Sequence, residues 1–239
     1  MELSVVIPAK NEAENVESLA GEIRAALDGV LDYELIYVDD GSTDATLEVL
    51  RKLRAGGFDR LRILRHSRSC GQSTAILSGV KAARAPWIAT LDGDGQNDPA
   101  DIPRLWQHLQ AASPRPTLIA GYRKKRQDNW VKRMSSRIAN GVRMRLLHDD
   151  TPDTGCGLKL FSREAFLALP YFDHMHRFLP ALMRRAGETV DIVEVHHRPR
   201  LHGRTKYGIS NRLWVGLVDM AGVMWLQRRA RRPDISEEA

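Results

Sequence analysis

The sequence predicts an α/β protein built on a largely parallel sheet, and three observations support this. Short apolar segments with the composition of buried strands alternate with segments whose apolar residues recur at helical spacing. Clusters of polar residues follow the strand segments, where a parallel sheet places its ligand-binding loops. The composition, 43% hydrophobic and 28% charged over 239 residues, is that of an ordinary globular protein that can bury a sizeable core.

The first half of the chain alternates regularly between the two kinds of element. In the first helix, Val16, Leu19 and Ile23 recur on one face. The expected strands are 3–9, 33–38, 60–66, 87–92 and 117–123, and the expected helices are 16–27, 44–54, 74–83 and 101–112.

The second half is less regular. Residues 131–147 have the pattern of an amphipathic helix, and 153–169 read as a turn, a short strand and a helix. Residues 188–200 are typical of an edge strand. The apolar segment 213–226 is fourteen residues long and contains Asp219, so it is too short to span a membrane comfortably.

Two cysteines, Cys70 and Cys156, lie far apart and outside any partner motif. They argue against a disulfide framework and a zinc site, and they indicate a reducing compartment. The N-terminus lacks a basic segment followed by a long apolar one, so we see no signal peptide and expect a cytoplasmic protein.

The net charge of +6 conceals a strong asymmetry. Residues 123–145 contain nine Lys or Arg against one acid, and 196–232 contain nine against one. Each segment therefore has a larger net positive charge than the whole chain, and the remaining residues together have a net negative charge. Basic patches of this kind bind nucleic acid, anionic lipid or phosphorylated substrates, and composition alone does not choose among them.

Residues 89–99, ATLDGDGQNDP, place Asp92, Asp94 and Asp98 within seven positions directly after a predicted strand. Carboxylates this close repel one another and are rarely buried without a partner. A solvated turn is one interpretation, and a bound cation is the other.

Six segments occur in the order seen in family-two glycosyltransferases of the GT-A fold. They are SVVIPAKNEAENV, IYVDDGSTDAT, GQSTAILSGVKAA, IATLDGDGQNDP, GYR and RPRLHGRTKYG. Within that family the chain resembles the polyprenyl-phosphate glycosyltransferases, a group that includes dolichyl-phosphate mannose synthase. The resemblance covers roughly residues 3–210. It implies a Rossmann-like, mostly parallel sheet flanked by helices, with a catalytic domain at 1–210 and a C-terminal amphipathic helix and tail at 211–239.

The resemblance assigns the DGDGQ segment to metal and donor binding. Asp94 and Gln96 would bind Mg²⁺ or Mn²⁺, and Asp92 with Gly93 would face the donor sugar. The chemistry fits, because a nucleoside diphosphate gains negative charge as it leaves and a hard cation held by oxygen ligands neutralises it.

The DDGSTD segment resembles the element that holds the nucleotide. Either aspartate of the pair would accept a hydrogen bond from the base. The nucleotide-binding residues implied are Pro8, Lys10, Glu12, Asp39 and Asp40. The alternative is that Ser42, Thr43 or Asp44 caps the following helix, and both interpretations can hold together.

Three further cations match positions that contact the diphosphate or the sugar of the donor. They are Arg123, Arg200 and Lys206, which with Asp92 and Asp94 make up the catalytic set implied by the resemblance. Arginine offers phosphate oxygens a planar fork, and lysine a compact charge. A solvated surface cation is the alternative for each of the three. Gly203 and Gly208 would let their segment close over the donor.

The acceptor implied is a polyprenyl phosphate. Its phosphate is already an anion, so inverting transfer needs no general base. The 149–160 region has no Glu-Asp pair of the sort that hydroxyl-accepting relatives use, although Asp149, Asp150 and Asp153 are nearby candidates. Arg133 or Arg137 could supply the cation for the acceptor phosphate.

The predicted helices at 131–147 and 213–226, the second followed by an arginine cluster, indicate a membrane-surface face. The alternative is that they pack on the core or form a dimer interface. Many relatives carry C-terminal transmembrane helices, whereas this sequence ends in RRPDISEEA. We therefore expect a protein peripheral at the cytoplasmic face of the membrane.

Three other functions compete with this hypothesis. A glycosyltransferase of the same fold with a hydroxyl acceptor predicts activity without lipid and a carboxylate base in 149–153. A nucleic-acid-binding protein is disfavoured, because the basic segments lack interleaved aromatic residues and recognised modules. The intact Asp92, Asp94 and Gln96 set disfavours a catalytically silent nucleotide-sugar binder.

Overall fold

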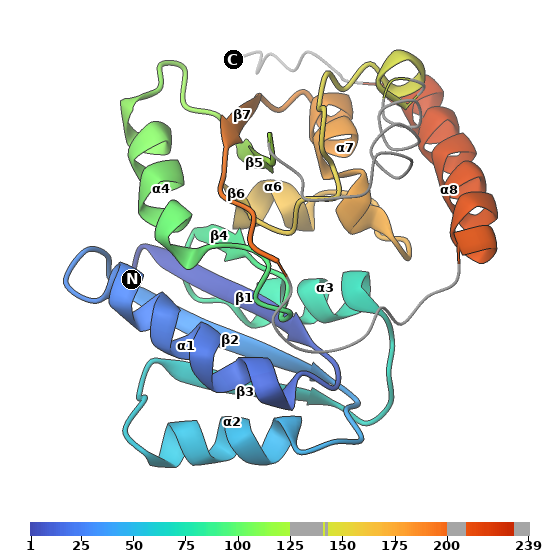
Figure 1. Ribbon diagram of the computed structural model, residues 1–239. Coiled ribbons are helices and arrows are strands. Elements are labelled where there is room, and N and C mark those ends of the chain that lie inside the picture. Colours follow the sequence, from blue (N-terminus) through green and yellow to red (C-terminus); the bar gives the residue numbers. More distant parts are fainter. Residues whose placement is uncertain (125–140, 142, 200–208, 232–239) are drawn as a thin grey trace, which may run out of the picture.

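The computed structural model describes residues 1–124, 141, 143–199 and 209–231, and of residues 209–213 it describes the backbone alone. Within these residues, one seven-stranded sheet forms the centre of the molecule, with the strand order β3-β2-β1-β4-β6-β5-β7 (Figure 1). The strands are β1 (Leu3–Ala9), β2 (Tyr33–Asp40), β3 (Leu61–His66), β4 (Trp87–Thr90), β5 (Leu118–Tyr122), β6 (Lys159–Ser162) and β7 (Val190–Glu194).

The helices follow the strands in the expected alternation. They are α1 (Ala13–Leu27), α2 (Thr46–Ala55), α3 (Gln72–Ala82), α4 (Ile102–Ala111), α6 (Arg163–Leu167), α7 (Leu179–Ala186) and α8 (Ile209–Arg229), with short 3₁₀ turns η1 (Pro99–Asp101) and η2 (Met175–Arg177). Residues 143–147 are also helical.

Each face of the sheet is covered by its own hydrophobic cluster. Along β1, Val5 and Ile7 join the cluster that contains residues of α1, α2 and α4, whereas Val6 joins the cluster with α3, α6, α7 and α8. This alternation is the period-two pattern of a strand buried on both faces. The result is a three-layer arrangement with helices on both sides (Figure 1).

The predicted α/β class and the largely parallel sheet are confirmed. The exception to the parallel arrangement is β6, which runs antiparallel to both β4 and β5. The edge position predicted for 188–200 is also confirmed, although β7 occupies only Val190–Glu194 of it. The predicted strand 87–92 is wrong at its end: β4 stops at Thr90, so that Asp92 lies in the loop that follows. The predicted domain division after residue 210 falls inside the first turn of α8.

The parallel register brings four loops to one edge of the sheet. β1 pairs in parallel with both β2 and β4, and β5 lies antiparallel to β6, which is itself antiparallel to β4. The carboxyl ends of β1, β2, β4 and β5 therefore face the same way. The ends of these strands and the loops after them hold most of the predicted site residues, as expected for an open α/β sheet.

Close packing of α3 on the sheet depends on Gly79. A Cβ at this position would lie 2.3 Å from Val6 Cγ1 and 3.2 Å from Val38 Cγ2. We expect Gly79→Ala to lower the free energy of unfolding by about 1–3 kcal/mol, because the added methyl overpacks a tight contact. Urea denaturation measures the change.

Gly21→Ala is the matched control, since a Cβ at this exposed position of α1 meets no heavy atom within 4 Å. It should raise stability by about 0.5–1 kcal/mol through helix propensity. Equal stability changes in the two variants would contradict the close approach of α3 to the sheet.

Candidate active site

The loop after β4 is built by its own side chains. The backbone N–H of Asp92 donates to Asn97 Oδ1 at 3.2 Å, and that of Gln96 donates to Asp94 Oδ1 at 3.1 Å. Gly95 takes a φ of +72°, which side chains disfavour and glycine permits. The third carboxylate of the cluster has a structural role: Asp98 caps η1, accepting from the N–H of Ala100 at 3.0 Å.

Asp92 lies at the centre of the site. Its Oδ1 accepts a hydrogen bond from Gln72 Nε2 at 2.8 Å, and a Cβ at Gly157 would lie 2.4 Å from its carboxylate. Burial raises the pKa of Asp92, and the charge of Asp94 adds to this, while Lys159 and Arg123 oppose it. The positive charges of Lys159 and Arg123 therefore favour the ionised form of Asp92, the carboxylate predicted to face the donor sugar.

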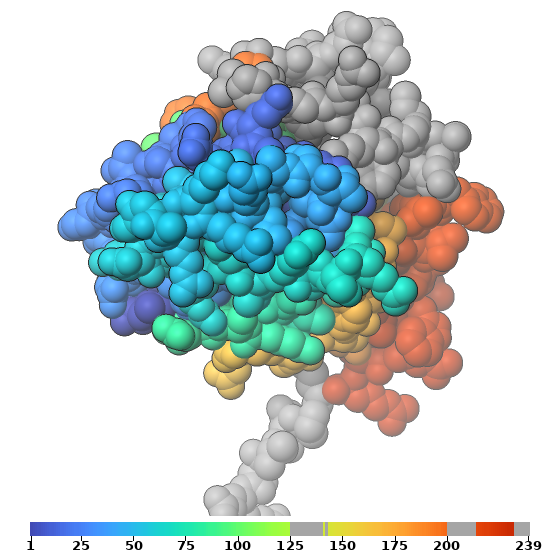
Figure 2. All heavy atoms as spheres, turned by 90° about the horizontal axis from the view of Figure 1, so that it is seen from below, coloured from blue at the N-terminus to red at the C-terminus, as the bar shows by residue number. Residues whose placement is uncertain are grey.

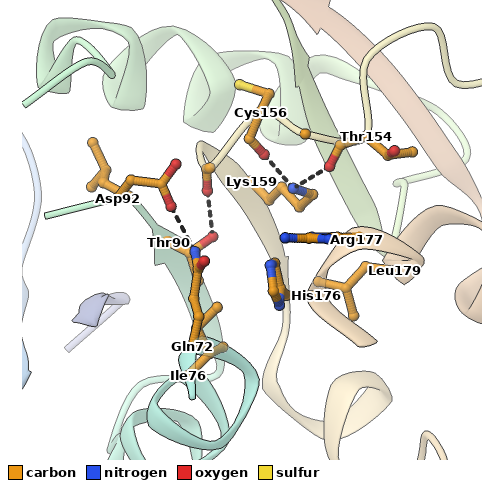
Figure 3. Close-up of a pocket in the computed structure, with 13 residues that line it drawn as sticks. Gln72, Ile76, Thr90, Asp92, Thr154, Cys156, Lys159, His176, Arg177 and Leu179 are labelled. Carbon is orange, nitrogen blue, oxygen red and sulfur yellow. Dashed lines mark hydrogen bonds between the residues drawn. The ribbon is translucent and has the colours of Figure 1, made fainter. Parts of the chain in front are cut away.

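A cavity of about 290 Å³ opens beside Asp92. Figure 3 shows Lys159, His176 and Arg177 close together across from Asp92, with Nζ of Lys159 directed to the carbonyl oxygens of Cys156 and Thr154. The lining residues are Gln72, Ile76, Thr90, Leu91, Asp92, Thr154, Gly155, Cys156, Gly157, Lys159, His176, Arg177 and Leu179.

Lys159 is a buried cation on β6, 4% exposed. Its Nζ donates to the carbonyl oxygens of Cys156 and, at 3.3 Å, of Thr154 (Figure 3). Burial lowers its pKa, opposed by the nearby acidic groups. These hydrogen bonds hold the 154–157 loop against the strand, and the same loop carries Gly157 next to Asp92.

His176 is fixed against α3. Its Nδ1 lies 2.7 Å from Ser73 Oγ, and its backbone N–H donates to the same oxygen at 3.3 Å. Burial, followed by the charges of Arg177 and Lys159, lowers the pKa of His176 well below the ordinary 6.5. The ring is therefore neutral at pH 7.

The buried neutral histidine predicts a pH-dependent stability. A histidine with a depressed folded pKa contributes its full stability above the unfolded pKa, and this is lost as the pH falls below that value, because the unfolded chain then binds more protons. From pH 7.5 to pH 5.5, the free energy of unfolding should fall by up to about 1.4 kcal/mol more in the wild type than in His176→Gln. Urea denaturation at several pH values measures this, and parallel curves for the two proteins would contradict the assignment.

Arg123, directly after β5, forms a two-pronged ion pair with Asp153. Its Nε lies 2.6 Å from Asp153 Oδ2 and its Nη2 lies 2.9 Å from Oδ1. Burial lowers the pKa of Arg123, but the pair with Asp153 outweighs this and raises it. The predicted donor contact of Arg123 stays a prediction, and Asp153 orients the side chain on which it depends.

The two aspartates at the end of β2 have different surroundings. Asp40 accepts from the backbone N–H groups of Cys70 and Gly71 at 2.8 and 3.0 Å and from Ser69 Oγ at 2.7 Å. It therefore holds the loop that leads into α3 and Gln72. Asp39 is buried; its Oδ1 accepts from the N–H of Ser42, while Oδ2 has no hydrogen-bond partner among the described residues and lies 3.6 Å from Arg65 Nε.

The carboxylate of Asp40 is thus used by hydrogen bonds within the chain, whereas Asp39 keeps one oxygen without a hydrogen bond among the described residues. The contact of either aspartate with the nucleotide base stays a prediction. The capping alternative is wrong, because the N-cap of α2 is Ala45, which offers no side-chain hydrogen bond. Asp44, the residue before this cap, accepts through Oδ1 from the N–H of Thr46. The remaining predicted nucleotide residues, Pro8, Lys10 and Glu12, lie at the end of β1 and before α1. A hydrogen bond connects the loop after β1 with the loop after β2, since Asn11 Oδ1 accepts from the N–H of Thr43 at 2.8 Å.

The DGDGQ loop offers oxygen ligands that suit a hard divalent cation. Asp94 supplies a carboxylate that is 9% exposed, and Gln96 an amide oxygen two residues further on. Gly93 allows the close approach of this loop to β1, since a Cβ there would lie 3.0 Å from the carbonyl oxygen of Pro8. The residues present fit Mg²⁺ or Mn²⁺, and the ligand assignment stays a prediction.

Several predicted site residues lie outside the described part of the chain. These are Arg133 and Arg137 for the acceptor phosphate, and Arg200 and Lys206 with Gly203 and Gly208 for the donor.

Sequence reasoning missed four residues that line the cavity: Gln72, Lys159, His176 and Arg177. A signal existed for two of them. Gln72 is the second residue of the GQST segment, and Lys159 is a charge between the apolar residues Leu158 and Leu160. For His176 and Arg177 no local pattern exists, because their position depends on how η2 packs against α3.

Solved structures of similar fold identify the fold class of this chain. The chain is similar to glucosyl-3-phosphoglycerate synthase from Mycobacterium tuberculosis, crystallised with Mn²⁺, UDP and glucosyl-3-phosphoglycerate, with a TM-score of 0.72 and 22% identity over 98% of this chain and 81% of that one. A second crystal structure of that enzyme holds Mg²⁺ and UDP, with a TM-score of 0.71. The protein has the GT-A fold.

Sequence relatives define the family. The model of Glycosyl transferase family 2 matches residues 4–169. The chain is 38% identical to dodecaprenyl-phosphate galacturonate synthase from Rhizobium johnstonii, over 98% of this chain and 69% of that protein. It is 33% identical to undecaprenyl-phosphate 4-deoxy-4-formamido-L-arabinose transferase from Edwardsiella ictaluri, over 87% of this chain and 63% of that protein. The chain belongs to glycosyl transferase family 2, and it is a glycosyltransferase.

Proposed function

We propose that the protein transfers the sugar of a nucleotide diphosphate sugar to a polyprenyl phosphate, with inversion at the anomeric carbon. The observation that carries the proposal is the position of Asp92 and Asp94, between the nucleotide-side loops after β1 and β2 and a cavity with basic walls. The relatives named above act on dodecaprenyl and undecaprenyl phosphates, which supports this acceptor class.

The proposed reaction is a single displacement. An oxygen of the acceptor phosphate attacks the anomeric carbon, the bond from this carbon to the diphosphate breaks, and the nucleoside diphosphate leaves with the electron pair. A divalent cation bound by Asp94 and Gln96 would neutralise charge on that leaving group. The chain's own residues position the reactants: Gln72 and Lys159 hold Asp92 and its neighbouring loop, and Asp153 orients Arg123.

The ion pair of Asp153 bears on the competing hypothesis of a hydroxyl acceptor. That reaction needs a general base within reach of the hydroxyl. Among the candidates, Asp153 is bound by Arg123, Asp149 is buried 3.4 Å from Arg143, and Asp150 lies 3.5 Å from Arg184. A phosphate acceptor needs no such base, so the ion pairs favour it.

The test is turnover with a panel of donors. Purified protein is mixed with GDP- and UDP-sugars, UDP-galacturonate among them, with Mg²⁺ or Mn²⁺ and a short polyprenyl phosphate, and the released nucleotide is measured. We expect release that requires both metal and lipid phosphate, and an α-linked donor should give a β-linked product. Equal release with and without lipid phosphate would overturn the acceptor assignment.

We also propose that α8 lies on the cytoplasmic surface of a membrane. Figure 2 shows α8, in red, at one side of the molecule, away from α2 in light blue. Val223 buries one face of the helix against the core, while Trp214, Leu217, Val218 and Trp225 remain 45–69% exposed. These four residues recur on one face, and basic residues follow at the end of the helix, as in interfacial helices. Within the described residues, no helix is long and apolar enough to cross a membrane.

Vesicle sedimentation tests the proposal for α8. The protein should bind vesicles with anionic lipid, and Trp214→Ser/Trp225→Ser should lose most of this binding while it keeps its unfolding midpoint. A concentration-dependent dimer that the double variant abolishes, without any vesicle binding, would identify the face as a subunit interface instead.

A further inference from the structure

The cavity beside Asp92 contains basic residues that the predicted site leaves without a role. We infer that this cavity binds the phosphate of the acceptor, with Arg177 as its direct ligand and with Lys159 and His176 shaping the wall around it. The inference rests on the proposed function and deepens it, since it identifies an acceptor site within the described residues.

The first argument is the direction of attack. In an inverting displacement the acceptor oxygen approaches the anomeric carbon opposite the leaving diphosphate. The proposed nucleotide loops follow β1 and β2, whereas β6, which carries Lys159, lies on the other side of β4 in the sheet order. Asp92 follows β4 and therefore lies between the two. An acceptor that enters through the cavity approaches from the side opposite the nucleotide.

The second argument is charge. Among the described residues that line the cavity, Asp92 is the one acid, whereas Lys159 and Arg177 are cations. Lys159 is anchored to two carbonyl oxygens, so its charge has a fixed place in the wall. Figure 3 shows the guanidinium of Arg177 directed into the same space. A planar guanidinium can donate two parallel hydrogen bonds to phosphate oxygens, which makes Arg177 the better direct ligand.

The third argument is the apolar part of the wall. Ile76, Leu91 and Leu179 line the cavity together with the basic residues. A prenyl phosphate has an anionic head joined directly to hydrocarbon, so it needs cations and apolar side chains side by side. A purely polar ligand, such as a sugar with a carboxylate, would leave these three side chains without a matching surface.

His176 is a positioning residue in this arrangement. It precedes Arg177 within η2, and its ring and backbone both contact Ser73 of α3. The short 3₁₀ turn is thereby fixed to the helix that also carries Gln72, the hydrogen-bond partner of Asp92. The phosphate ligand and the carboxylate at the donor sugar are thus tied to the same helix.

Steady-state kinetics of the full chain test the inference. In Arg177→Gln, the KM for a short polyprenyl phosphate should rise about 10- to 100-fold, the range of hydrogen bonds to a charged group. The KM for the donor should change by less than about threefold, because Arg177 contacts the acceptor and not the donor in this arrangement. Arg177→Lys should recover part of the loss, because it restores the charge without the fork. Arg51→Gln, at an exposed position of α2, is the matched control and should leave both constants unchanged.

The outcomes separate this inference from the proposed function. An unchanged KM for the lipid in Arg177→Gln, with the wild type active, would overturn the inference alone. A rise in the KM for the donor that occurs only with a carboxylated sugar would move the cavity to the donor and overturn the acceptor assignment. If the wild type shows no turnover, calorimetric titration with the prenyl phosphate tests the inference by binding alone. Binding by the wild type that is lost in Arg177→Gln would support the inference. No binding by the wild type would overturn both the inference and the proposed acceptor.

Discussion

Asp94→Ala should reduce transfer at least about 1,000-fold, because a metal ion on a leaving diphosphate contributes several kcal/mol to the transition state. The loss should be in kcat, and raising the metal concentration should recover little of it. Calorimetric titration of Mn²⁺ in the presence of the nucleoside diphosphate gives a readout besides activity, and binding should weaken markedly in the variant. Unaltered metal binding would remove Asp94 from the ligand set.

Asp98→Ala is the matched control for this prediction. Asp98 lies four residues further along the same loop, but its carboxylate caps η1 through the N–H of Ala100. Loss of the cap should cost about 1 kcal/mol of stability, which urea denaturation measures. Activity at 25 °C should stay within about twofold of the wild type, since surface cap losses act on stability. Comparable inactivity of both variants would indicate that the loop as a whole, and not the carboxylate of Asp94, is required.

Gly157→Ala should reduce kcat/KM about 100-fold with little change in stability, the cost of misplacing a reacting group by about 1 Å. The added Cβ would lie 2.4 Å from Cγ and Oδ2 of Asp92 and 2.6 Å from Oδ1. The obstructing atoms are the end of a rotatable side chain, so Asp92 turns away and the backbone stays in place. The rotation breaks the hydrogen bond from Gln72, and the carboxylate leaves the position from which it faces the sugar.

Thermal unfolding distinguishes this from a folding defect. The midpoint of Gly157→Ala should stay within a few degrees of the wild type, whereas Gly79→Ala, whose Cβ meets packed side chains of β1 and β2, should unfold earlier. Gly21→Ala again serves as the control, with full activity. A Gly157→Ala protein with wild-type kcat/KM would show that the carboxylate of Asp92 can turn without loss of function.

Local pattern was enough for most of the fold and for the centre of the site. The alternating apolar runs predict β1 to β5 within a few residues, because a strand buried on both faces must be apolar throughout and its ends carry turn residues. The aspartates of the DGDGQ segment stand next to a strand in the chain itself. Their spacing alone therefore indicates either a solvated turn or a cation site, and the resemblance to the family assigns Asp94 and Gln96 as the metal ligands.

Other parts of the site were decided only by tertiary structure. Asp39 and Asp40 are adjacent and chemically identical, yet Asp40 binds the loop before α3 while Asp39 does not. Asp98 is an acid of the same cluster as Asp94, yet it caps a 3₁₀ turn. Such assignments depend on which backbone N–H groups the packed elements bring within hydrogen-bond distance, and that information is not local.

The sequence by itself determined the α/β class, the order of the elements and the acidic loop after β4, since each of these follows from periodicity or from neighbours in the chain. The tertiary structure decided that Gln72 reaches Asp92, that Asp153 holds Arg123, and that Lys159 and Arg177 meet across one cavity. These residues are 20 to 30 positions apart or come from different elements. Only the closing of β6 between β4 and β5, and the packing of η2 on α3, brings their charges together.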